Sequence, residues 1–199
     1  MKNRILNKII LLLFLSAYIN MYAGEIKGHI ETDANKTKYK AYCVVYIEKA
    51  DGNFKPPAKN PEMNQKSLVF TPRVMPVLVG TTVNFLNNDD VLHNVFSPDA
   101  CADKFNLGSW KKGEIRSHKF SQTGCRSVIL CNVHPEMEAY VVVLQNPYFS
   151  STDKDGNFSI KNVPAGKYTL KVWNEKLKGP AQEITVSGAK VDVVFKLAK

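Results

Sequence analysis

The feature that most constrains the fold is a succession of short apolar or alternating segments separated by turn residues. Alternation with a period of two and enrichment in β-branched residues are typical of strands, and no segment shows a convincing amphipathic helical pattern. This density of short strands predicts an all-β protein built from sandwiches or barrels. The candidate strands span residues 25–31, 40–48, 66–71, 74–79, 81–87, 91–97, 114–120, 126–131, 138–144, 157–161, 166–173, 181–186 and 191–197.

Residues 1–23 have the pattern of a cleavable signal peptide. Three basic residues, Lys2, Arg4 and Lys8, precede an apolar core at 9–19, which is too short to span a bilayer comfortably. Cleavage after Ala23 would release an exported protein with no membrane span. An uncleaved N-terminal anchor is the alternative.

The charge of the mature chain indicates a class of partner. Without the three basic residues of the signal peptide, the 27 Lys and Arg fall to 24 against 18 Asp and Glu, a net charge of +6. A positive surface favours contact with an acidic protein surface, whereas scattered charge for solubility is the simpler explanation. The basic residues do not gather with aromatic residues, so the sequence does not indicate nucleic-acid binding.

Two composition shifts suggest domain boundaries. Residues 53–65 contain three prolines and no periodicity, and residues 145–157 contain the turn dipeptide Asp155-Gly156. The central stretch has enough strands for a complete sandwich, while the flanking stretches have too few unless they combine. We therefore expect a domain inserted into a discontinuous one, with a simple tandem as the alternative. The predicted divisions are 24–50 and 147–199 for the outer domain, 51–63 for a linker, and 64–146 for the inserted domain.

A candidate metal site lies in the segment CNVHPEM, which contains Cys131, His134 and Met137, with His93 upstream in VLHNVFSP. One thiolate, two imidazoles and a weak, distant thioether are the ligands of a blue-copper electron-transfer site. Zinc prefers four strong ligands, and a thioether is a poor one. A strand ending in RSVILC would deliver the cysteine, and the following tight loop would supply the next two donors. The pattern predicts one type 1 copper held by His93, Cys131, His134 and Met137.

Each of these residues has an ordinary structural explanation when it is taken alone. A single histidine at a strand end is usually a surface residue, and a single methionine is usually part of a core. The loop is more informative because three soft donors lie within seven residues after a β-strand pattern. Together with the His-Asn pair after GTTVNFLNNDDV, this spacing favours a metal site over coincidence.

The remaining cysteines are Cys43, Cys101 and Cys125. Export would place them where disulfides persist. Cys101 and Cys125 both fall in loop-like stretches, SPDACADK and SQTGCRS, so we expect them to form the disulfide. Cys43 lies in the alternating segment KAYCVVYIE, which indicates a buried apolar residue more than a reactive thiol.

Residues 64–145 resemble a small cupredoxin of the plastocyanin and amicyanin kind. The stretches that carry the resemblance are FTPRVMPVLVGTTVNFLNNDDVLHNVFSP, FSQTG and VILCNVHPEMEAYVVVL. The whole mature chain also resembles periplasmic proteins described as methylamine-utilisation-like. The segment NPYFSSTDKDGNFSIKNVPAGKYTLKVWNE is similar to a carboxypeptidase regulatory-like domain, a transthyretin-type β-sandwich, whose usual opening strands resemble GEIKGHIE and YKAYCVVYIE. Cys101 and Cys125 depart from the small-cupredoxin pattern.

The resemblance implies a role for each residue of the site. His93, Cys131 and His134 would be equatorial copper ligands and Met137 the axial one. Asn94 matches the residue that steadies the ligand loop and hydrogen-bonds near the thiolate in cupredoxins. His134, beside Pro135 and other apolar residues, would be the port through which an electron leaves.

The expected function is one-electron transfer between periplasmic redox proteins, with an acidic docking surface on a partner. A copper-delivery protein without electron cycling and a non-catalytic β-sandwich binding module are the alternatives. We do not expect an enzyme, because four ligands leave no open position on the metal, and the chain lacks G-x-S-x-G, H-E-x-x-H, phosphate-loop and C-x-x-C-H motifs.

Overall fold

The computed structural model describes residues 23–199, and it confirms the predicted all-β fold class. Apart from two short 3₁₀ segments, η1 (Ala34–Tyr42) and η2 (Ala100–Ala102), the regular elements of this part are strands. The predicted signal peptide lies, except for Ala23, outside the described residues. Within residues 23–199 no helix is long and apolar enough to cross a membrane.

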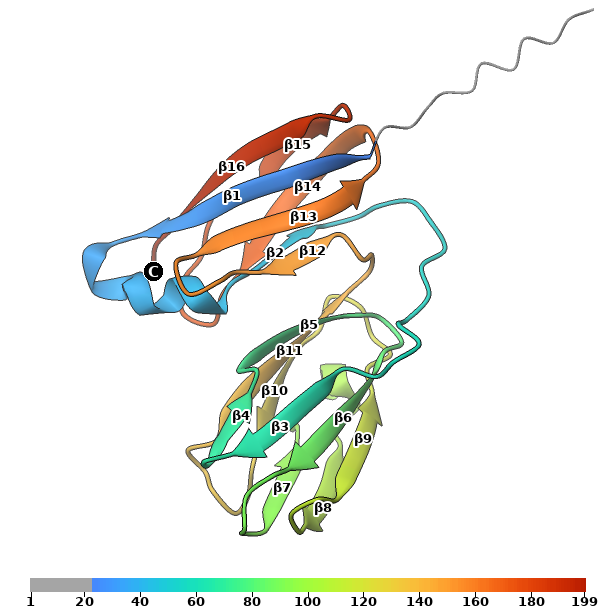
Figure 1. Ribbon diagram of the computed structural model, residues 1–199, viewed down its shortest axis with the longest axis vertical. Helices are drawn as coiled ribbons and strands as arrows, with labels where there is room; N and C mark the ends of the chain where they lie inside the picture. Colours follow the sequence, from blue (N-terminus) through green and yellow to red (C-terminus); the bar gives the residue numbers. More distant parts are fainter. Residues whose placement is uncertain (1–22) are drawn as a thin grey trace, which may run out of the picture.

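Seven strands form the unit that we call the outer sandwich, drawn in the upper part of Figure 1. One of its sheets has the order β13-β1-β16 and the other has the order β12-β2-β14-β15. Apolar residues of both sheets, among them Ile26, Ile47 and Phe195, form one buried cluster. The strands are β1 (Gly24–Thr32), β2 (Val44–Ile47), β12 (Phe149–Ser151), β13 (Asn157–Val163), β14 (Gly166–Trp173), β15 (Gln182–Val186) and β16 (Lys190–Leu197).

Nine strands form the inner sandwich, drawn in the lower part of Figure 1. Its sheets have the orders β5-β11-β10-β7-β8 and β4-β3-β6-β9, and their facing side chains, including Phe85 and Ile129, form a second cluster. The strands are β3 (Glu62–Lys66), β4 (Val69–Thr71), β5 (Val74–Leu78), β6 (Thr82–Asn87), β7 (His93–Phe96), β8 (Asn106–Trp110), β9 (Ile115–Lys119), β10 (Arg126–Leu130) and β11 (Glu138–Leu144).

The chain leaves the outer sandwich after β2 and returns to it at β12. The two connections lie together, because the side chain of Gln145 makes hydrogen bonds with both the N–H and the carbonyl oxygen of Ala50. A third apolar cluster joins the two sandwiches and includes Val142 of the inner one and Trp173 of the outer one. The sandwiches are therefore in direct contact along one face as well as linked through the chain.

Several elements differ from the sequence-based expectations. Residues 34–42 form η1, so the strand expected over 40–48 begins only at Val44. The last two residues of the predicted linker 51–63 belong to β3, and the strand expected over 66–71 is a hairpin that turns at Ser67-Leu68. Strands β8 and β12 were not predicted, because the segments NLGSW and FSS carry little apolar alternation.

Candidate metal centre

Three neighbouring strands of one inner sheet deliver the predicted donors. His93 is the first residue of β7, Cys131 directly follows β10, and His134 lies in the loop that leads to β11. Because β10 lies between β7 and β11 in the sheet, the end of β10 is adjacent to both flanking segments. The sheet order thus brings together residues that are 38 or more positions apart in the chain.

The donor atoms of these three residues converge. The Nδ1 atoms of His93 and His134 are 3.1 Å apart, and the Sγ atom of Cys131 is 4.0 Å from Nδ1 of His93. All three donors lie within 4.8 Å of one another. His93 is fully buried and Cys131 is 2 % exposed. Two imidazole nitrogens and one sulfur grouped at these separations are a donor set that suits copper.

Met137 belongs to the same loop and the same core. Its side chain is 1 % exposed and is part of the buried cluster that contains Cys131. Its backbone N–H donates to the carbonyl oxygen of His134 at 3.0 Å, which closes the loop into a tight turn. Met137 therefore belongs to the ligand loop through its backbone and to the core around Cys131 through its side chain.

Asn94 connects the two segments that carry the donors. Its backbone N–H lies 3.4 Å from Sγ of Cys131, and its side-chain oxygen accepts a hydrogen bond from the N–H of Asn132 at 3.2 Å. Its side-chain nitrogen donates to Asn106 and to the carbonyl oxygen of Gly108 on β8. A donor directed at the sulfur stabilises a thiolate, and the remaining bonds fix the ligand loop against the sheet.

Asp89 contacts a candidate donor, and the sequence pattern did not single it out. Its carboxylate lies 2.8 Å from Nε2 of His93, and its side chain is 15 % exposed. A carboxylate accepts a hydrogen bond from Nε2–H, which leaves Nδ1 unprotonated and directed at Cys131 and His134. The tautomer that a metal requires is therefore already favoured. The i, i+4 spacing of Asp89 and His93 was a signal that the two side chains could meet. Only the fold shows that the loop bends back and brings them together.

The same carboxylate supports an unusual turn. Ser67 and Leu68 have positive φ values of 56° and 60°, which are costly for residues other than glycine. Their N–H groups donate to the two oxygens of Asp89 at 2.7 and 3.0 Å. Burial alone would raise the pKa of Asp89, but the amides of Leu68 and Ser67 and the His93 ring lower it below the ordinary value. Asp89 is thus held as an anion between the β3–β4 hairpin and the metal centre.

Exposed apolar residues occur in the loops that contain or precede the two candidate histidine donors. Val91 and Leu92 precede His93 and are 47 % and 49 % exposed, while Val133, which precedes His134, is 45 % exposed. Pro135 is also exposed, whereas His134 itself is half-buried. Exposed apolar residues therefore precede both candidate histidine donors in the chain.

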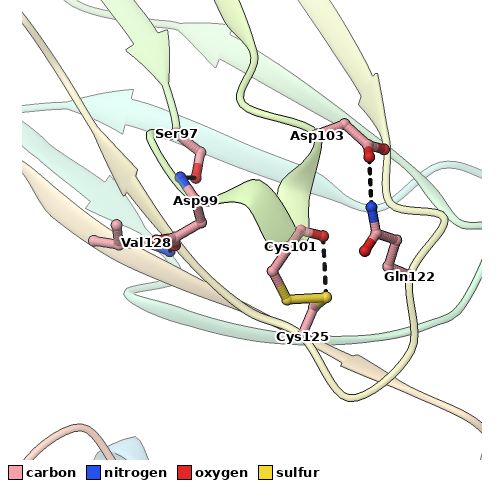
Figure 2. Close-up of a disulfide and its surroundings, with 7 residues drawn as sticks. All are labelled: Ser97, Asp99, Cys101, Asp103, Gln122, Cys125 and Val128. Atoms are coloured by element: carbon pink, nitrogen blue, oxygen red, sulfur yellow. Dashed lines mark hydrogen bonds between the residues drawn. A yellow bond between two sulfur atoms is a disulfide. The ribbon is translucent and has the colours of Figure 1, made fainter.

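The structure joins Cys101 and Cys125 by a disulfide bond (Figure 2). Cys101 lies in η2 and Cys125 directly precedes β10, whose other end leads to Cys131. The carboxylate of Asp99 accepts a hydrogen bond from the N–H of Val128 at 2.7 Å and thus adds a second link between the same two segments. The β7–β8 connection is therefore fixed to the strand that carries the metal-site cysteine.

Cys43 is the second free cysteine, and it lies in the outer sandwich. It is 1 % exposed, and its sulfur accepts a hydrogen bond from the side-chain nitrogen of Asn174 at 3.4 Å. Burial raises the pKa of the Cys43 thiol to about 11, although hydrogen bonds from Asn174 and Thr152 oppose this shift. Such a thiol stays protonated and is a structural residue.

Comparison with family models gave one match. Residues 130–193 match the model described as polysaccharide lyase family 4, domain II. This segment runs from the end of β10 through most of the outer sandwich. The match falls on the region for which the sequence suggested a carboxypeptidase regulatory-like domain, and that resemblance stays a prediction. No match was found among curated proteins.

Solved structures similar to the chain include cupredoxins. A purple cupredoxin from Nitrosopumilus maritimus is 25 % identical over 42 % of this chain and 99 % of its own, with a TM-score of 0.38. A reduced mutant of amicyanin is 23 % identical over 45 % of this chain and 91 % of its own, with a TM-score of 0.41. A copper-containing nitrite reductase from Thermus scotoductus is 25 % identical over 50 % of this chain and 25 % of its own, with a TM-score of 0.42.

Proposed function

We propose that this protein is a one-electron carrier with a single type 1 copper in the inner sandwich. The observation that carries the proposal is the convergence of Nδ1 of His93, Sγ of Cys131 and Nδ1 of His134 within 4.8 Å. Met137, buried in the same loop, would supply the weak axial ligand. This donor set suits both oxidation states of copper, which would supply the one-electron chemistry.

The protein would hold the donors in one arrangement while the charge of the site changes. Asn94 directs an N–H at the sulfur, Asp89 fixes the His93 ring, and both are anchored in neighbouring strands. Full burial of His93 excludes water from one side of the site. A site whose ligands are fixed before the electron arrives needs little rearrangement when it is reduced.

His134 would be the point of electron exchange with a partner. It is half-buried in a loop whose neighbours Val133 and Pro135 are exposed, and Val91 and Leu92 add apolar surface from the β6–β7 loop. Small apolar contacts of this kind suit the brief docking that electron transfer requires. The proposed partners are periplasmic redox proteins with an acidic docking surface, and export through residues 1–23 belongs to the same proposal.

We further propose that the chain is not itself an enzyme. Four protein ligands would leave copper no open position for a substrate, and Met137 would occupy the fourth coordination position. The metal centre would therefore exchange electrons through its ligands and would not bind and transform a molecule.

Reconstitution with Cu(II) tests the proposal. We expect an intense blue band from the thiolate, a bound copper stoichiometry of one, and reversible one-electron voltammetry. A colourless complex that binds copper without a reversible wave would favour copper delivery. Absence of specific copper binding would favour a β-sandwich binding module and would overturn the proposal.

A further inference from the structure

Arg73 connects the ligand loop of the inner sandwich to the outer sandwich. It lies between β4 and β5, and its carbonyl oxygen accepts a hydrogen bond from the N–H of Tyr140 on β11 at 2.8 Å. This backbone bond places Arg73 beside the first residues of β11, where the ligand loop ends. Its guanidinium is flanked by the rings of Tyr42 and Tyr140, at 6.0 and 5.9 Å from their centroids.

The guanidinium holds Glu138, the residue that follows Met137, at two points. Nη2 of Arg73 donates to a carboxylate oxygen of Glu138 at 2.8 Å, and Nη1 donates to the carbonyl oxygen of the same residue at 3.2 Å. A planar guanidinium that binds both a side chain and its own backbone fixes the position and the orientation of that residue. The residue so fixed is covalently joined to the proposed axial ligand.

The outer sandwich supplies the second acidic partner of Arg73. Nη2 donates to a carboxylate oxygen of Glu175 at 2.7 Å, and the Glu175 side chain is only 5 % exposed. Glu175 comes two residues after Trp173, whose ring packs 5.3 Å from that of Tyr140. Burial alone would lower the pKa of Arg73, but the bonds and charges of Glu175 and Glu138 raise it, so Arg73 keeps its charge.

Arg73 and the end of the ligand loop border the same hollow. A hollow of about 430 Å³ is lined by Val69, Phe70, Arg73, Glu136 and Met137 among others. Side chains that border open space have fewer contacts to resist a shift than those in a closed core. Hydrogen bonds from Arg73 therefore act on the side of the loop that borders this hollow, in addition to the pairing of Glu138 with Leu130 of β10.

We propose that the outer sandwich positions the axial ligand of the metal centre through the chain Glu175–Arg73–Glu138. This inference rests on the proposed copper site and assigns a role to the second sandwich. Glu175 is a positioning residue: it orients Arg73, which sets where the loop ends and hence how closely the thioether of Met137 approaches the metal. The axial ligand tunes the reduction potential of a blue-copper site, so the outer sandwich would tune it as well.

The test compares Glu175→Gln with Glu48→Gln in the full, copper-loaded chain. Glu48 forms an ion pair with Lys171 in the outer sandwich, near the opposite end of β11, and serves as the matched control. We expect Glu175→Gln to change the relative intensities of the visible absorption bands. It should also change the equilibrium constant for one-electron exchange with a redox mediator by up to about tenfold, which is a shift of about 59 mV in reduction potential. The control should match the wild type in both measurements.

A double-mutant cycle assigns the effect to Arg73. In an Arg73→Gln background, Glu175→Gln should cause no further change, because the connection is already broken. Hydrogen exchange of the Met137 N–H in the metal-free protein gives an independent measure, and we expect it to be faster in Glu175→Gln. Arg73→Lys keeps the charge without the two-point contact and should behave like Arg73→Gln.

The outcomes separate this inference from the proposed function. A blue wild type together with a folded Glu175→Gln variant of unchanged spectrum and potential would overturn the inference alone. The same holds if Glu175→Gln causes its full shift in the Arg73→Gln background. A colourless wild-type complex would instead overturn the copper-carrier proposal on which the inference rests.

Discussion

The two sandwiches of this chain each bury one free cysteine, in very different surroundings. Cys131 of the inner sandwich faces two histidine nitrogens, whereas Cys43 of the outer sandwich faces Asn174 and the carbonyl oxygen of Tyr39. Burial is nearly the same, at 2 % and 1 % exposure. The difference teaches that the neighbouring donor atoms, and not burial, separate a candidate ligand from a structural thiol.

The two sandwiches also differ in net charge. Residues 51–145 contain 10 Lys and Arg against 9 Asp and Glu, while residues 23–50 and 146–199 together contain 14 against 9. The excess positive charge of the mature chain therefore lies mainly on the outer sandwich. If an acidic partner is attracted electrostatically, the outer sandwich would contribute most of that attraction, while the inner one contributes the apolar contact.

The largest expected effect comes from replacing the two cysteines in turn. Cys131→Ala removes the proposed thiolate ligand, so we expect complete loss of the blue band and a fall in copper affinity of more than about 100-fold. Cys43→Ala should leave both unchanged, because Cys43 is not part of any group of three possible metal-donor side chains among the described residues. Absorption spectra and competition with a copper chelator measure the two effects. Retention of the blue band in Cys131→Ala would contradict the assignment of Cys131 as the ligand and Cys43 as the structural thiol.

The fold and the ligand set were largely accessible from the sequence, because they depend on local patterns. Alternating segments predicted most strands, and donor spacing singled out Cys131, His134 and Met137. Each of these two signals is contained in a short, continuous segment of the sequence. The turn at Ser67-Leu68 has no such signal, because neither residue favours positive φ and its support comes from Asp89, more than 20 positions away.

The contacts around the ligands were not accessible for the same reason. Glu175 and Arg73 are 102 positions apart and meet only because the two sandwiches pack together. Such contacts depend on how sheets are placed, which alternation and turn signals do not specify. Sequence patterns thus indicated the candidate donors, whereas the structure shows which residues contact them.

The second prediction concerns the disulfide, which only the inner sandwich contains among the described residues. Replacing Cys101 and Cys125 by serine frees a loop of 24 residues, and on the chain-entropy model this costs about 3 kcal/mol of unfolding free energy. Hydrogen exchange at low denaturant should show lost protection in β7 and β10 and unchanged protection in β1 and β16. Equal losses in both sandwiches would show that they unfold as one unit and would contradict this expectation.

The third prediction uses the raised pKa of Cys43. The thiol has a pKa of about 11 in the folded protein against an ordinary value of 9.0, so the unfolded state loses its proton first as the pH rises. The stability that this group contributes is therefore complete below about pH 9 and is lost as the pH rises towards 11. The loss amounts to about 2 to 3 kcal/mol. Urea unfolding of the metal-free wild type and of Cys43→Ala should diverge over this range, and parallel curves would refute the assignment.

The smallest expected effect is a difference in copper affinity between variants of two adjacent residues, Asp89 and Asp90. Asp89→Asn removes the charge that fixes the His93 ring and supports the hairpin turn, and we expect copper affinity to fall about tenfold, as is typical when an outer contact of a ligand is lost. Asp90→Asn is the matched control, since Asp90 is 89 % exposed and its ion pair with Lys112 lies at the surface. Because exposed ion pairs contribute little, its affinity should stay within about twofold of the wild type. Equal affinities for the two variants would mean that the donors of the inner sandwich hold their arrangement without Asp89. The strands themselves would then be sufficient to support the candidate ligands.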